Sequence, residues 1–417
     1  MLPVEARRWQ YVERATIAVV ESFGYEEIRL PLLEPTELFS RGLGEATDAV
    51  EKEMYNLLDR DGEQLSLRPE GTASCVRAGL QHGLLFNQTQ RLWYRGPMFR
   101  YERPQKGRYR QFEQVGAEVF GIPGPEVEAE LIQMCATLFR TLGVLNGVRL
   151  EINTLGSGTS RKAYREALVA YLTPRRAELD ADSQRRLDRN PLRILDSKDA
   201  ATQRVLAGAP NLADYLDDAS KAHFAELRRL LESLQIPYVV NPRLVRGLDY
   251  YTHTVFEWVT DELGSQGTVC AGGRYDGLVE QLGGRPTPGA GYAIGMDRVV
   301  LLHEAMNRSF ATDAVDGYAI VLDAAHAGWS MAVCQQVREA VPGIRVRPGS
   351  GGKLKNQMKR ADASGAQWAL IFGEDEVANN VVTLKWLRED VPQECLSVPA
   401  LIERLARWKS GSNQGRR

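Results

Sequence analysis

The sequence contains few of the residues that build disulfide frameworks and metal sites. It has five cysteines among 417 residues, an odd number, and no two of them form a CxxC pair. It also has five histidines, and none of them lies in the HExxH spacing of a zinc enzyme. A disulfide scaffold and a metal site are therefore not expected. We interpret the cysteines as buried, reduced thiols.

Long apolar segments and a strong net charge are also absent. No segment approaches the roughly 20 apolar residues that span a bilayer, and the charged, amphipathic N-terminus does not resemble a signal peptide. The 52 Lys and Arg and the 54 Asp and Glu give a net charge of −2. Hydrophobic residues make up 43% of the chain, an ordinary globular value. We therefore expect a soluble, cytoplasmic protein of two or three domains with no membrane segment.

Hydrophobic periodicity divides the chain into blocks. Apolar residues at helical spacing predict a first helix that ends near Gly24. Residues 89–121 are typical of a β-hairpin, and strand-like and helical runs alternate near the C-terminus. We predict a core in two parts, a helical insertion, a linker, an α/β domain and a disordered tail. The corresponding boundaries are 1–158 and 237–305 for the core, 159–236 for the insertion, 306–316 for the linker, 317–408 for the α/β domain and 409–417 for the tail.

The charge of the chain is uneven. Residues 317–417 hold 14 Lys and Arg against 10 Asp and Glu, a net charge of +4, so residues 1–316 carry −6. Apolar residues share one face of a predicted helix in this segment: Leu354, Met358 and Ala361. Basic residues project from its other faces: Lys355, Lys359 and Arg360. A solvated helix face and a surface that follows phosphates are both compatible with this pattern.

Clusters rich in Arg, Gly and Tyr fall around the predicted antiparallel strands. In the hairpin, Arg100 shares a sheet with Gln114 and Glu118, which lie on one strand face by their period of two. A guanidinium beside carboxylates and amides suits a pocket that binds a phosphate and an amine together. An exposed polar face is the alternative for the hairpin alone. Arg298 is predicted at a helix N-terminus, where anions are favoured, and the clusters together predict a nucleotide site.

Several segments match the motifs of one enzyme family. The sharpest are LVRGLDYYTHTVFEW at 244–258, AGGRYDGL at 271–278 and LRPEGT at 67–72. Three broader segments are Gly24 to Leu33, Phe99 to Phe112 and Gly291 to Arg298, which resemble motifs 1, 2 and 3 of class II aminoacyl-tRNA synthetases. Over residues 2–408 the chain resembles the bacterial histidyl-tRNA synthetases.

The resemblance implies a fold and an activity. The fold is α+β, a class II synthetase core of antiparallel β-sheet flanked by helices, with a helical insertion and a C-terminal α/β anticodon-binding domain. The activity is that of a histidine–tRNA ligase, which activates histidine with ATP to histidyl-adenylate and pyrophosphate and then transfers histidine to the 3′ end of tRNA(His). ATP with Mg²⁺ would be a substrate, no prosthetic group would be needed, and motif 1 implies a homodimer.

The resemblance also implies roles for individual residues. The catalytic residues, at the α-phosphate and the substrate carboxylate, would be Arg100 and Arg246. Histidine would be bound by Glu70, Thr72, Gln114, Glu118, Tyr250, Tyr251 and Tyr275. ATP would be bound by Arg100, Glu102, Arg108, Phe112 and Arg298. The residues in contact with tRNA would be Arg103, Gln105, Lys355, Lys359 and Arg360. A solvated polar loop is the alternative for the first two of these.

The N-terminus departs from the family pattern. Family members usually begin with a short Arg-Gly-containing stretch ahead of the Leu-Pro found here at Leu2-Pro3, and this sequence lacks it. Either the start codon is assigned late or an N-terminal strand is missing. Dimer packing and contacts with the tRNA acceptor end would depend on that strand.

Two other functions are compatible with a synthetase-like sequence. One is a paralogue that regulates ATP phosphoribosyltransferase, which binds histidine but does not charge tRNA. The other is a tRNA-binding or stress-sensing relic of a synthetase. The chain has the arginines that such relics lose and a complete C-terminal domain, which favours the ligase. These arginines are Arg100, Arg108, Arg246 and Arg298.

Overall fold

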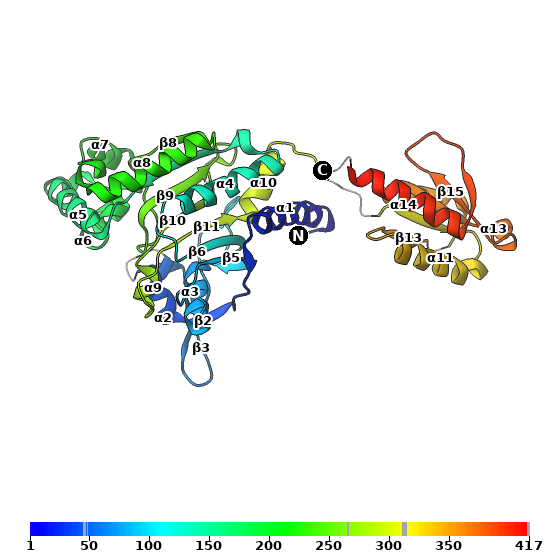
Figure 1. The fold of residues 1–417 in the computed structure, drawn as a ribbon, viewed down its shortest axis with the longest axis horizontal. Coiled ribbons are helices and arrows are strands. Elements are labelled where there is room, and N and C mark those ends of the chain that lie inside the picture. The colour runs from blue at the N-terminus through cyan, green and yellow to red at the C-terminus, as the bar shows by residue number, and fades with distance from the viewer. Residues whose placement is uncertain (45–46, 48, 265–266, 311–314, 350, 415–417) are drawn as a thin grey trace. The chain divides into compact units, whose positions relative to one another are not determined.

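The structure is a computed structural model that describes residues 1–44, 47, 49–264, 267–310, 315–349 and 351–414. Contacts divide the chain into two compact units, Arg8–Ser309 and Phe310–Arg417 with Met1–Arg7. Figure 1 labels the helices and strands of both. Among the described residues, no helix has both the length and the apolar character that crossing a bilayer requires.

An eight-stranded sheet forms the centre of the larger unit. Its six inner strands pair antiparallel, and one short parallel strand lies at each edge. The hairpin predicted for residues 89–121 is confirmed as the pair β5 and β6. In spatial order the strands are β1 (Glu26–Glu27), β5 (Gln90–Phe99), β6 (Gln111–Phe120), β11 (Gly289–Gly295), β10 (Thr268–Arg274), β9 (Thr252–Val259), β7 (Arg149–Thr154) and β8 (Tyr238–Val240).

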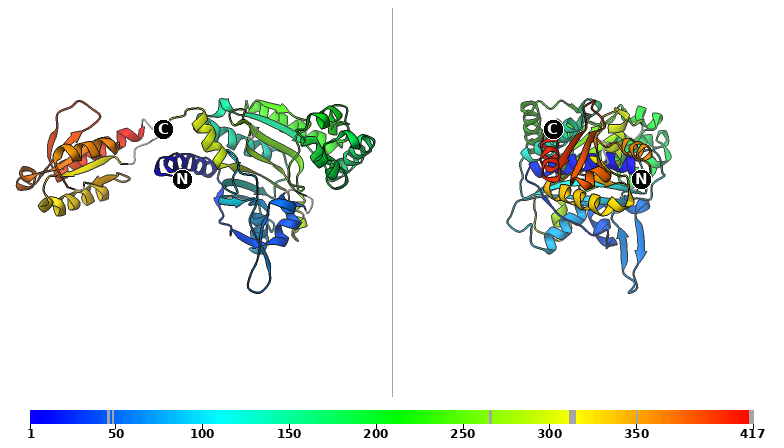
Figure 2. Two further views of the ribbon diagram at one scale, coloured as in Figure 1. Left: turned by 180° about the vertical axis from the view of Figure 1, so that it is seen from behind. Right: turned by 90° about the vertical axis from the view of Figure 1, so that its right-hand side faces the viewer.

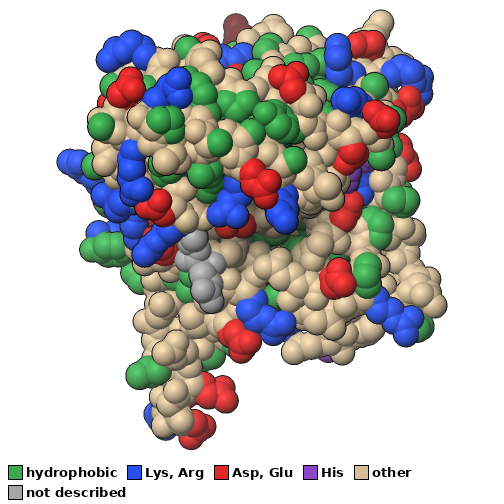
Figure 3. Space-filling view, turned by 90° about the vertical axis from the view of Figure 1, so that its left-hand side faces the viewer, with side chains coloured by type: hydrophobic (Ala, Val, Ile, Leu, Met, Phe, Trp, Pro, Cys, Tyr) green, Lys and Arg blue, Asp and Glu red, His purple; other side chains and the backbone are tan. Residues whose placement is uncertain are grey.

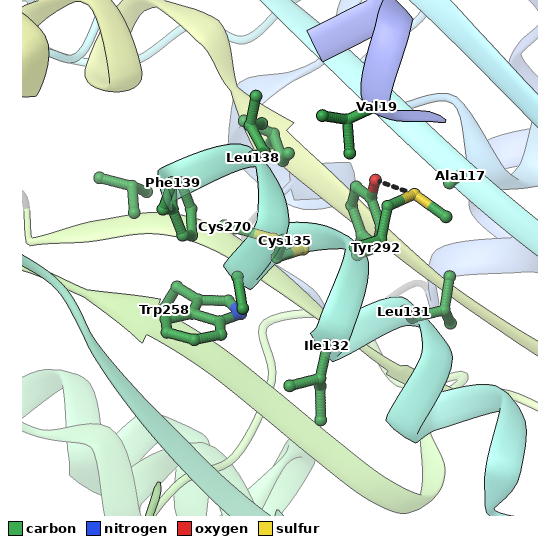
Figure 4. Packing of buried hydrophobic residues seen from close by; sticks show 14 of the residues in the cluster. Val19, Ala117, Leu131, Ile132, Cys135, Leu138, Phe139, Trp258, Cys270 and Tyr292 are labelled. Atoms are coloured by element: carbon green, nitrogen blue, oxygen red, sulfur yellow. Dashed lines mark hydrogen bonds between the residues drawn. The ribbon is translucent and has the colours of Figure 1, made fainter. Parts of the chain in front are cut away.

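Long helices cover one face of this sheet, as Figures 1 and 2 show. They are α1 (Pro3–Ser22), α4 (Glu126–Thr141), α8 (Asp218–Ser233) and α10 (Met296–Ala305). A short 3₁₀ helix, η2 (Leu145–Gly147), follows α4. The apolar stripe of α4 is buried against the strands, and Figure 4 shows Cys135 and Leu138 on its inner side. The Tyr292 hydroxyl of β11 donates to Met134 Sδ of α4 at 2.9 Å, and Figure 4 labels Tyr292. This face holds the main apolar core.

Shorter elements pack on the opposite face and bury a second apolar cluster. Because side chains alternate along a strand, the neighbours Trp93 and Tyr94 of β5 belong to different clusters. The elements are α2 (Thr36–Leu43), η1 (Ala49–Glu53), α3 (Thr72–Gln81), α9 (Leu278–Gln281) and the antiparallel strands β2 (Leu33–Pro35), β4 (Gln64–Leu67) and β3 (Tyr55–Leu58).

The regular elements between β7 and β8 are all helical in the described chain. They are α5 (Gly158–Leu172), η3 (Thr173–Glu178), α6 (Ala181–Arg189), η4 (Pro191–Asp196), α7 (Ala200–Leu206), η5 (Leu212–Tyr215) and α8. Side chains accept backbone N–H groups at the starts of the α-helices and so stabilise a very polar segment. These N-cap residues are Ser157, Asp180, Asp199 and Asp217. The boundaries 159–236 stay a prediction, because contacts place the insertion and the core in one unit.

The smaller unit is an α/β domain around a five-stranded sheet. Three strands are parallel, and β15 and β16 continue the sheet antiparallel. In spatial order they are β13 (Val346–Pro348), β12 (Gly317–Val321), β14 (Trp368–Phe372), β15 (Val381–Trp386) and β16 (Glu394–Ser397). The helices are η7 (Ala324–His326), α11 (Ala327–Ala340), α12 (Leu354–Ala363), α13 (Glu374–Ala378) and α14 (Val398–Gln414).

One prediction for the smaller unit is wrong in part. The helix α14 continues to Gln414, so residues 409–414 are not a disordered tail, and residues 415–417 lie outside the described chain. Its Lys409 Nζ pairs with the buried Asp316 carboxylate at 2.8 Å, which holds this turn in place. In α12, Ala361 of the predicted apolar face is buried and Leu354 is 45% exposed. The neighbouring Gln357 is also buried, and its amide donates to the Val321 carbonyl at 2.6 Å.

The arginine of the AGGRYDGL segment does not belong to a nucleotide site. Arg274 is fully buried on the core side, where its Nε donates to Glu128 of α4 at 3.0 Å. His223 of α8 lies 2.6 Å from the same carboxylate. Burial alone would raise the pKa of Glu128, but hydrogen bonds from His223 and Arg274 lower it to about 2. The ion pair therefore joins α4, α8 and β10 inside the larger unit.

We predict that Glu128→Ala destabilises the larger unit by about 3–5 kcal/mol, because it leaves a buried guanidinium without its carboxylate. The matched control is Glu126→Ala, an exposed residue in the first turn of the same helix, with an expected loss below about 1 kcal/mol. Urea unfolding followed by tryptophan fluorescence measures both. Equal losses in the two variants would contradict the assignment of a buried ion pair.

Candidate functional site

A cavity lies on the face of the eight-stranded sheet opposite α4. Most of the histidine and ATP residues predicted from the sequence line it. They are Glu70, Thr72, Arg100, Glu102, Arg108, Phe112, Gln114, Arg246, Tyr250, Tyr251 and Arg298. They come from α3, the β5–β6 hairpin, the segment before β9 and the start of α10. The structure therefore brings together segments that are far apart in the sequence.

The alternation of β6 builds the floor of the cavity. Gln114, Gly116 and Glu118 lie on the cavity side, as their spacing predicts. The intervening Val115, Ala117 and Val119 belong to the core beneath α4. On the neighbouring strand β11, Gly291 faces Glu118, and a Cβ at this position would overlap the carboxylate. Glycine is therefore required there by the close approach of the buried carboxylate.

Glu118 is fully buried behind the cavity wall and is held by hydroxyl groups. Two hydroxyls donate to Glu118 Oε1, that of Thr72 at 2.7 Å and that of Tyr94 at 2.9 Å. The Tyr275 hydroxyl donates to Glu118 Oε2. Burial raises the pKa of this carboxyl to about 8, although these hydrogen bonds lower it. Glu118 and Tyr275 thus lie directly behind the lining residue Thr72. Burial holds the carboxyl in an environment that resists ionisation.

A second carboxylate and an amide complete the polar part of this end. Glu70 accepts the backbone N–H groups of Thr72 at 2.6 Å and Ala73 at 2.9 Å, at the N-terminus of α3. Burial raises the pKa of Glu70. The buried Oε1 of Gln114 has no hydrogen-bond partner among the described residues. A buried amide oxygen without a donor is costly, so the cavity is suited to a ligand that supplies N–H groups.

Three tyrosines pack together at the same end, and two of them, Tyr250 and Tyr251, line the cavity. The ring centroids of Tyr250 and Tyr251 are 4.6 Å apart, and those of Tyr250 and Tyr275 are 5.5 Å apart. All three residues are buried. Their rings offer flat apolar surface and their hydroxyls offer hydrogen bonds, a combination suited to a small heteroaromatic ring.

Two arginines line the cavity from different segments, Arg246 from the residues before β9 and Arg100 from the β5–β6 hairpin. Arg246 forms an ion pair with Glu257 of β9, and its Cζ lies 5.7 Å from the centre of the Tyr251 ring. Burial alone would lower the pKa of Arg246, but Glu257 outweighs it and the pKa is raised. Arg100 donates to the Pro69 carbonyl at 2.9 Å, and its Cζ lies 5.4 Å from the centre of the Phe112 ring.

Two further arginines stand at the other end of the cavity. Arg298 donates to the backbone carbonyls of Gly107 at 2.9 Å and Thr268 at 2.6 Å. Arg108 pairs with Glu102 across the hairpin loop. Burial, and next the positive charge of Arg108, lower the pKa of Arg298. Cations that repel one another within one cavity favour a polyanionic ligand such as a triphosphate.

Sequence reasoning missed several residues that hold the predicted ones in place. Glu257 pairs with Arg246 and also accepts from Thr268 Oγ1 at 2.9 Å. Tyr94 supports Glu118 from the first strand of the hairpin. A signal existed for Glu257, because it is a carboxylate within the strand-like run TVFEW. The ion pair of Glu257 with Arg246 forms only when the loop before β9 folds back onto that strand, so it leaves no local pattern in the sequence.

The predicted tRNA residues do not line this cavity. Arg103 and Gln105 are exposed in the loop of the hairpin, where Gln105 and Arg108 exchange backbone hydrogen bonds of 3.0 and 2.9 Å. Lys355, Lys359 and Arg360 are exposed on α12 of the smaller unit. A shallow hollow there is lined by Lys355 and Lys359 together with apolar residues of β15 and α12.

Comparison with known families decides among the alternatives. The model of the histidyl-tRNA synthetase family matches residues 1–299, and the model of the anticodon binding domain matches residues 320–408. The chain belongs to the histidyl-tRNA synthetase family. It is therefore a histidine–tRNA ligase, as the sequence motifs predicted, and the α+β fold with an anticodon-binding domain is confirmed.

One solved structure supports this assignment, and two more distant ones share the fold. The apo histidyl-tRNA synthetase of S. aureus is 34% identical, with a TM-score of 0.80 over 97% of each chain. The histidyl-tRNA synthetase of Nostoc sp. PCC 7120 is 20% identical, with a TM-score of 0.70 over 98% of this chain and 97% of that one. An ATP phosphoribosyltransferase regulatory subunit/histidyl-tRNA synthetase of Bacillus halodurans is 21% identical, with a TM-score of 0.62 over 89% of this chain and 95% of that one. The last two share the fold with this synthetase.

We predict a pH-dependent stability that originates at Glu118. The folded protein keeps on this carboxyl a proton that the unfolded chain releases near pH 4.5, because the folded pKa is about 8. The free energy of unfolding should therefore fall, relative to Glu118→Gln, as the pH rises from about 4.5 to about 8. Urea unfolding of both unliganded proteins across this interval measures the difference. A difference that is independent of pH would show that the carboxyl is already ionised at low pH.

Proposed function

We propose that the cavity joins histidine to ATP with histidine at the Glu118 end and ATP at the Arg298 end. Glu70, Thr72 and Gln114 would hold the α-amino group, to which their oxygens can offer hydrogen bonds. Glu118 and the tyrosines would surround the imidazole. The observation that carries the proposal is one cavity with unsatisfied amide oxygen and buried carboxylates at one end and crowded guanidinium groups at the other.

The arginines would lower the barrier of the first step. The histidine carboxylate attacks the α-phosphorus of ATP in line, and negative charge grows on the phosphate oxygens. Arg100 and Arg246 would be aimed at those oxygens and at the attacking carboxylate, in positions fixed before the substrate arrives. One preorganised donor of this kind contributes about 2.7–4 kcal/mol. Since Arg246 is held by Glu257, its guanidinium would need little reorganisation to act at the phosphate.

The ATP tail and base would occupy the remaining part of the cavity. Arg108 and Arg298 would bind the outer phosphates, Phe112 would stack on adenine and Glu102 would help to position the base. ATP would enter as its magnesium complex, in which phosphate oxygens supply ligands to the ion. No covalent intermediate with a protein nucleophile is required, because the substrate carboxylate is the nucleophile.

Selectivity for histidine would follow from the buried polar groups. Glu118 can accept from one ring N–H, and a tyrosine hydroxyl can contact the other ring nitrogen. An amino acid without these groups would leave buried atoms unpaired, and such pockets discriminate by roughly 10⁴ or more. Binding alone would then give sufficient accuracy without hydrolytic editing.

The second step needs the tRNA. The terminal ribose hydroxyl of tRNA(His) would attack the carbonyl of the adenylate, and we assign no protein base to this transfer. Arg103 and Gln105 extend from the hairpin whose residues line the cavity, so they would contact the acceptor end. Lys355, Lys359 and Arg360 would follow the phosphates of the anticodon region.

We also propose a homodimer and a cytoplasmic location. The motif 1 segment supports the dimer, because β1 is an edge strand and the following Leu32 and Leu33 are each 43% exposed. Edge strands with exposed apolar neighbours are suited to pairing with another chain. The cytoplasm is where tRNA, ATP and free histidine meet. Analytical ultracentrifugation of the wild type tests the dimer.

We predict that Glu118→Ala abolishes histidine activation and leaves ATP binding intact. The variant loses the acceptor for the ring N–H, whereas the Arg298 end is unchanged. Histidine-dependent exchange of labelled pyrophosphate into ATP measures activation, and calorimetry measures ATP binding. Near-normal exchange would refute the histidine pocket assigned here.

We predict that Lys355→Ala with Lys359→Ala weakens tRNA(His) binding without changing pyrophosphate exchange. Loss of two phosphate contacts should reduce the salt dependence of binding by about two units of slope. Arg407→Ala on α14, where Arg407 pairs with Glu403, is the control for removal of a surface charge. An unchanged salt slope in the double variant would contradict the phosphate-binding assignment of α12.

A further inference from the structure

The segment that carries the catalytic arginine and two tyrosines is held by the helical insertion. This segment, residues 246–251, which we call the histidine loop, contains no helix or strand. Loops of this kind need contacts outside themselves to keep one conformation. The insertion supplies such contacts from α5 and from the residue between α6 and η4.

Arg161 of α5 binds the histidine loop at two points. Its Nη1 donates to the carbonyl of Asp249 at 3.1 Å and to the carbonyl of Tyr251 at 2.7 Å. One guanidinium thus fixes two carbonyls that lie two residues apart and enclose Tyr250. A hydrogen bond from a charged donor to a carbonyl is stronger than one between neutral groups. The orientation of the peptide groups around both tyrosines therefore depends on a residue of the insertion.

Asn190 makes a second contact from the insertion. Its Nδ2 donates to Asp249 Oδ1 at 2.7 Å. On the other side of the loop, the backbone N–H of Asp249 donates to the Leu43 carbonyl at 3.1 Å. Gly44 follows at a φ of +93°, where a Cβ would lie 2.7 Å from the Asp249 carboxylate. Asp249 is thus clamped between α2 and the insertion.

The insertion is also anchored beside this clamp. Arg189, next to Asn190, pairs with Glu51 of η1 at 2.6 Å. Around it the insertion carries a group of arginines, and Figure 3 looks onto this side of the molecule, where Lys and Arg side chains gather towards the left margin. The contacts between the insertion and the loop therefore lie at a docked surface and not on an isolated helix.

We propose that Arg161 and Asn190 are positioning residues for histidine, through which the insertion sets the conformation of the histidine loop. The inference rests on the proposed roles of Arg246, Tyr250 and Tyr251 in the cavity. It assigns the insertion a part in amino-acid activation, before any tRNA is bound. Neither residue lines the cavity, so both act through the loop.

The first test is a series at Arg161, measured by pyrophosphate exchange without tRNA. Arg161→Ala should raise the KM for histidine at least about tenfold, as expected for loss of a charge-assisted hydrogen bond. The KM for ATP should change much less, because Phe112 and Arg298, the residues proposed for adenine and the outer phosphates, lie on β6 and α10, and Arg246 is held by Glu257 outside the loop. Arg161→Lys should recover part of the affinity, since one ammonium can reach one of the two carbonyls.

The matched control is Lys162→Ala on the same helix. Lys162 is exposed and makes no hydrogen bond or ion pair with any residue that the structure describes. The Lys162→Ala substitution removes one positive charge next to Arg161, and the KM values for histidine and ATP should both stay at the wild-type level. If Arg161→Ala leaves the histidine KM unchanged, or raises the KM values for histidine and ATP equally, the proposal is wrong.

The second test exchanges the partners of the Asn190 contact. Asn190→Asp places a carboxylate against Asp249 and should raise the histidine KM more than Asn190→Ala does. Adding Asp249→Asn restores a donor and an acceptor, so the double variant should recover much of the affinity. Failure of the double variant to improve on Asn190→Asp would overturn the coupling.

Arg246→Ala separates this inference from the proposed function. It should lower the rate of exchange by a factor of roughly 10² or more, because a phosphate donor is removed. If exchange survives in Arg246→Ala, the proposed cavity is wrong. If exchange is lost there but the Arg161 and Asn190 variants bind histidine normally, only the role of the insertion is wrong.

Discussion

The central strands of the large sheet must present apolar side chains to a layer of helices on one face and polar side chains to a cavity on the other. The pleat allows this, because successive residues of β6 face opposite sides. Val115, Ala117 and Val119 pack into the core under α4, while Gln114 and Glu118 serve the cavity. A shift of register by one residue would bury the carboxylate under α4 and expose the valines. The position of the whole site therefore depends on the pairing of β5, β6 and β11.

The polar groups of the cavity are fixed by the protein before a ligand binds. Hydroxyls hold Glu118, the N-terminus of α3 holds Glu70 and Glu257 holds Arg246. Such partners keep charged side chains from collapsing onto each other in an empty cavity. They also reduce the reorganisation that the reaction requires. The contacts of Arg161 with the histidine loop extend the same principle from side chains to the backbone.

The sequence predicts the fold class, the hairpin, the helical segment and most of the residues that line the cavity. These features leave local signals, such as period-two alternation in β6 and helical spacing in α4. Contacts between distant segments leave none, so the partner of Arg246 and the buried ion pair of Arg274 were not foreseen. The error at the end of α14 and the unforeseen burial of Gln357 in α12 have the same origin. The Gln357 amide binds the Val321 carbonyl of β12, and Lys409 binds Asp316 across the smaller unit.

The most direct test of the account is a crystal structure with a non-hydrolysable histidyl-adenylate analogue. We expect the imidazole beside Glu118 and Tyr251, the phosphate between Arg100 and Arg246, and the adenine on Phe112. That arrangement would show that both substrates share one cavity on the open face of the sheet. An analogue bound with the adenine against the tyrosines, or outside this cavity, would contradict the account.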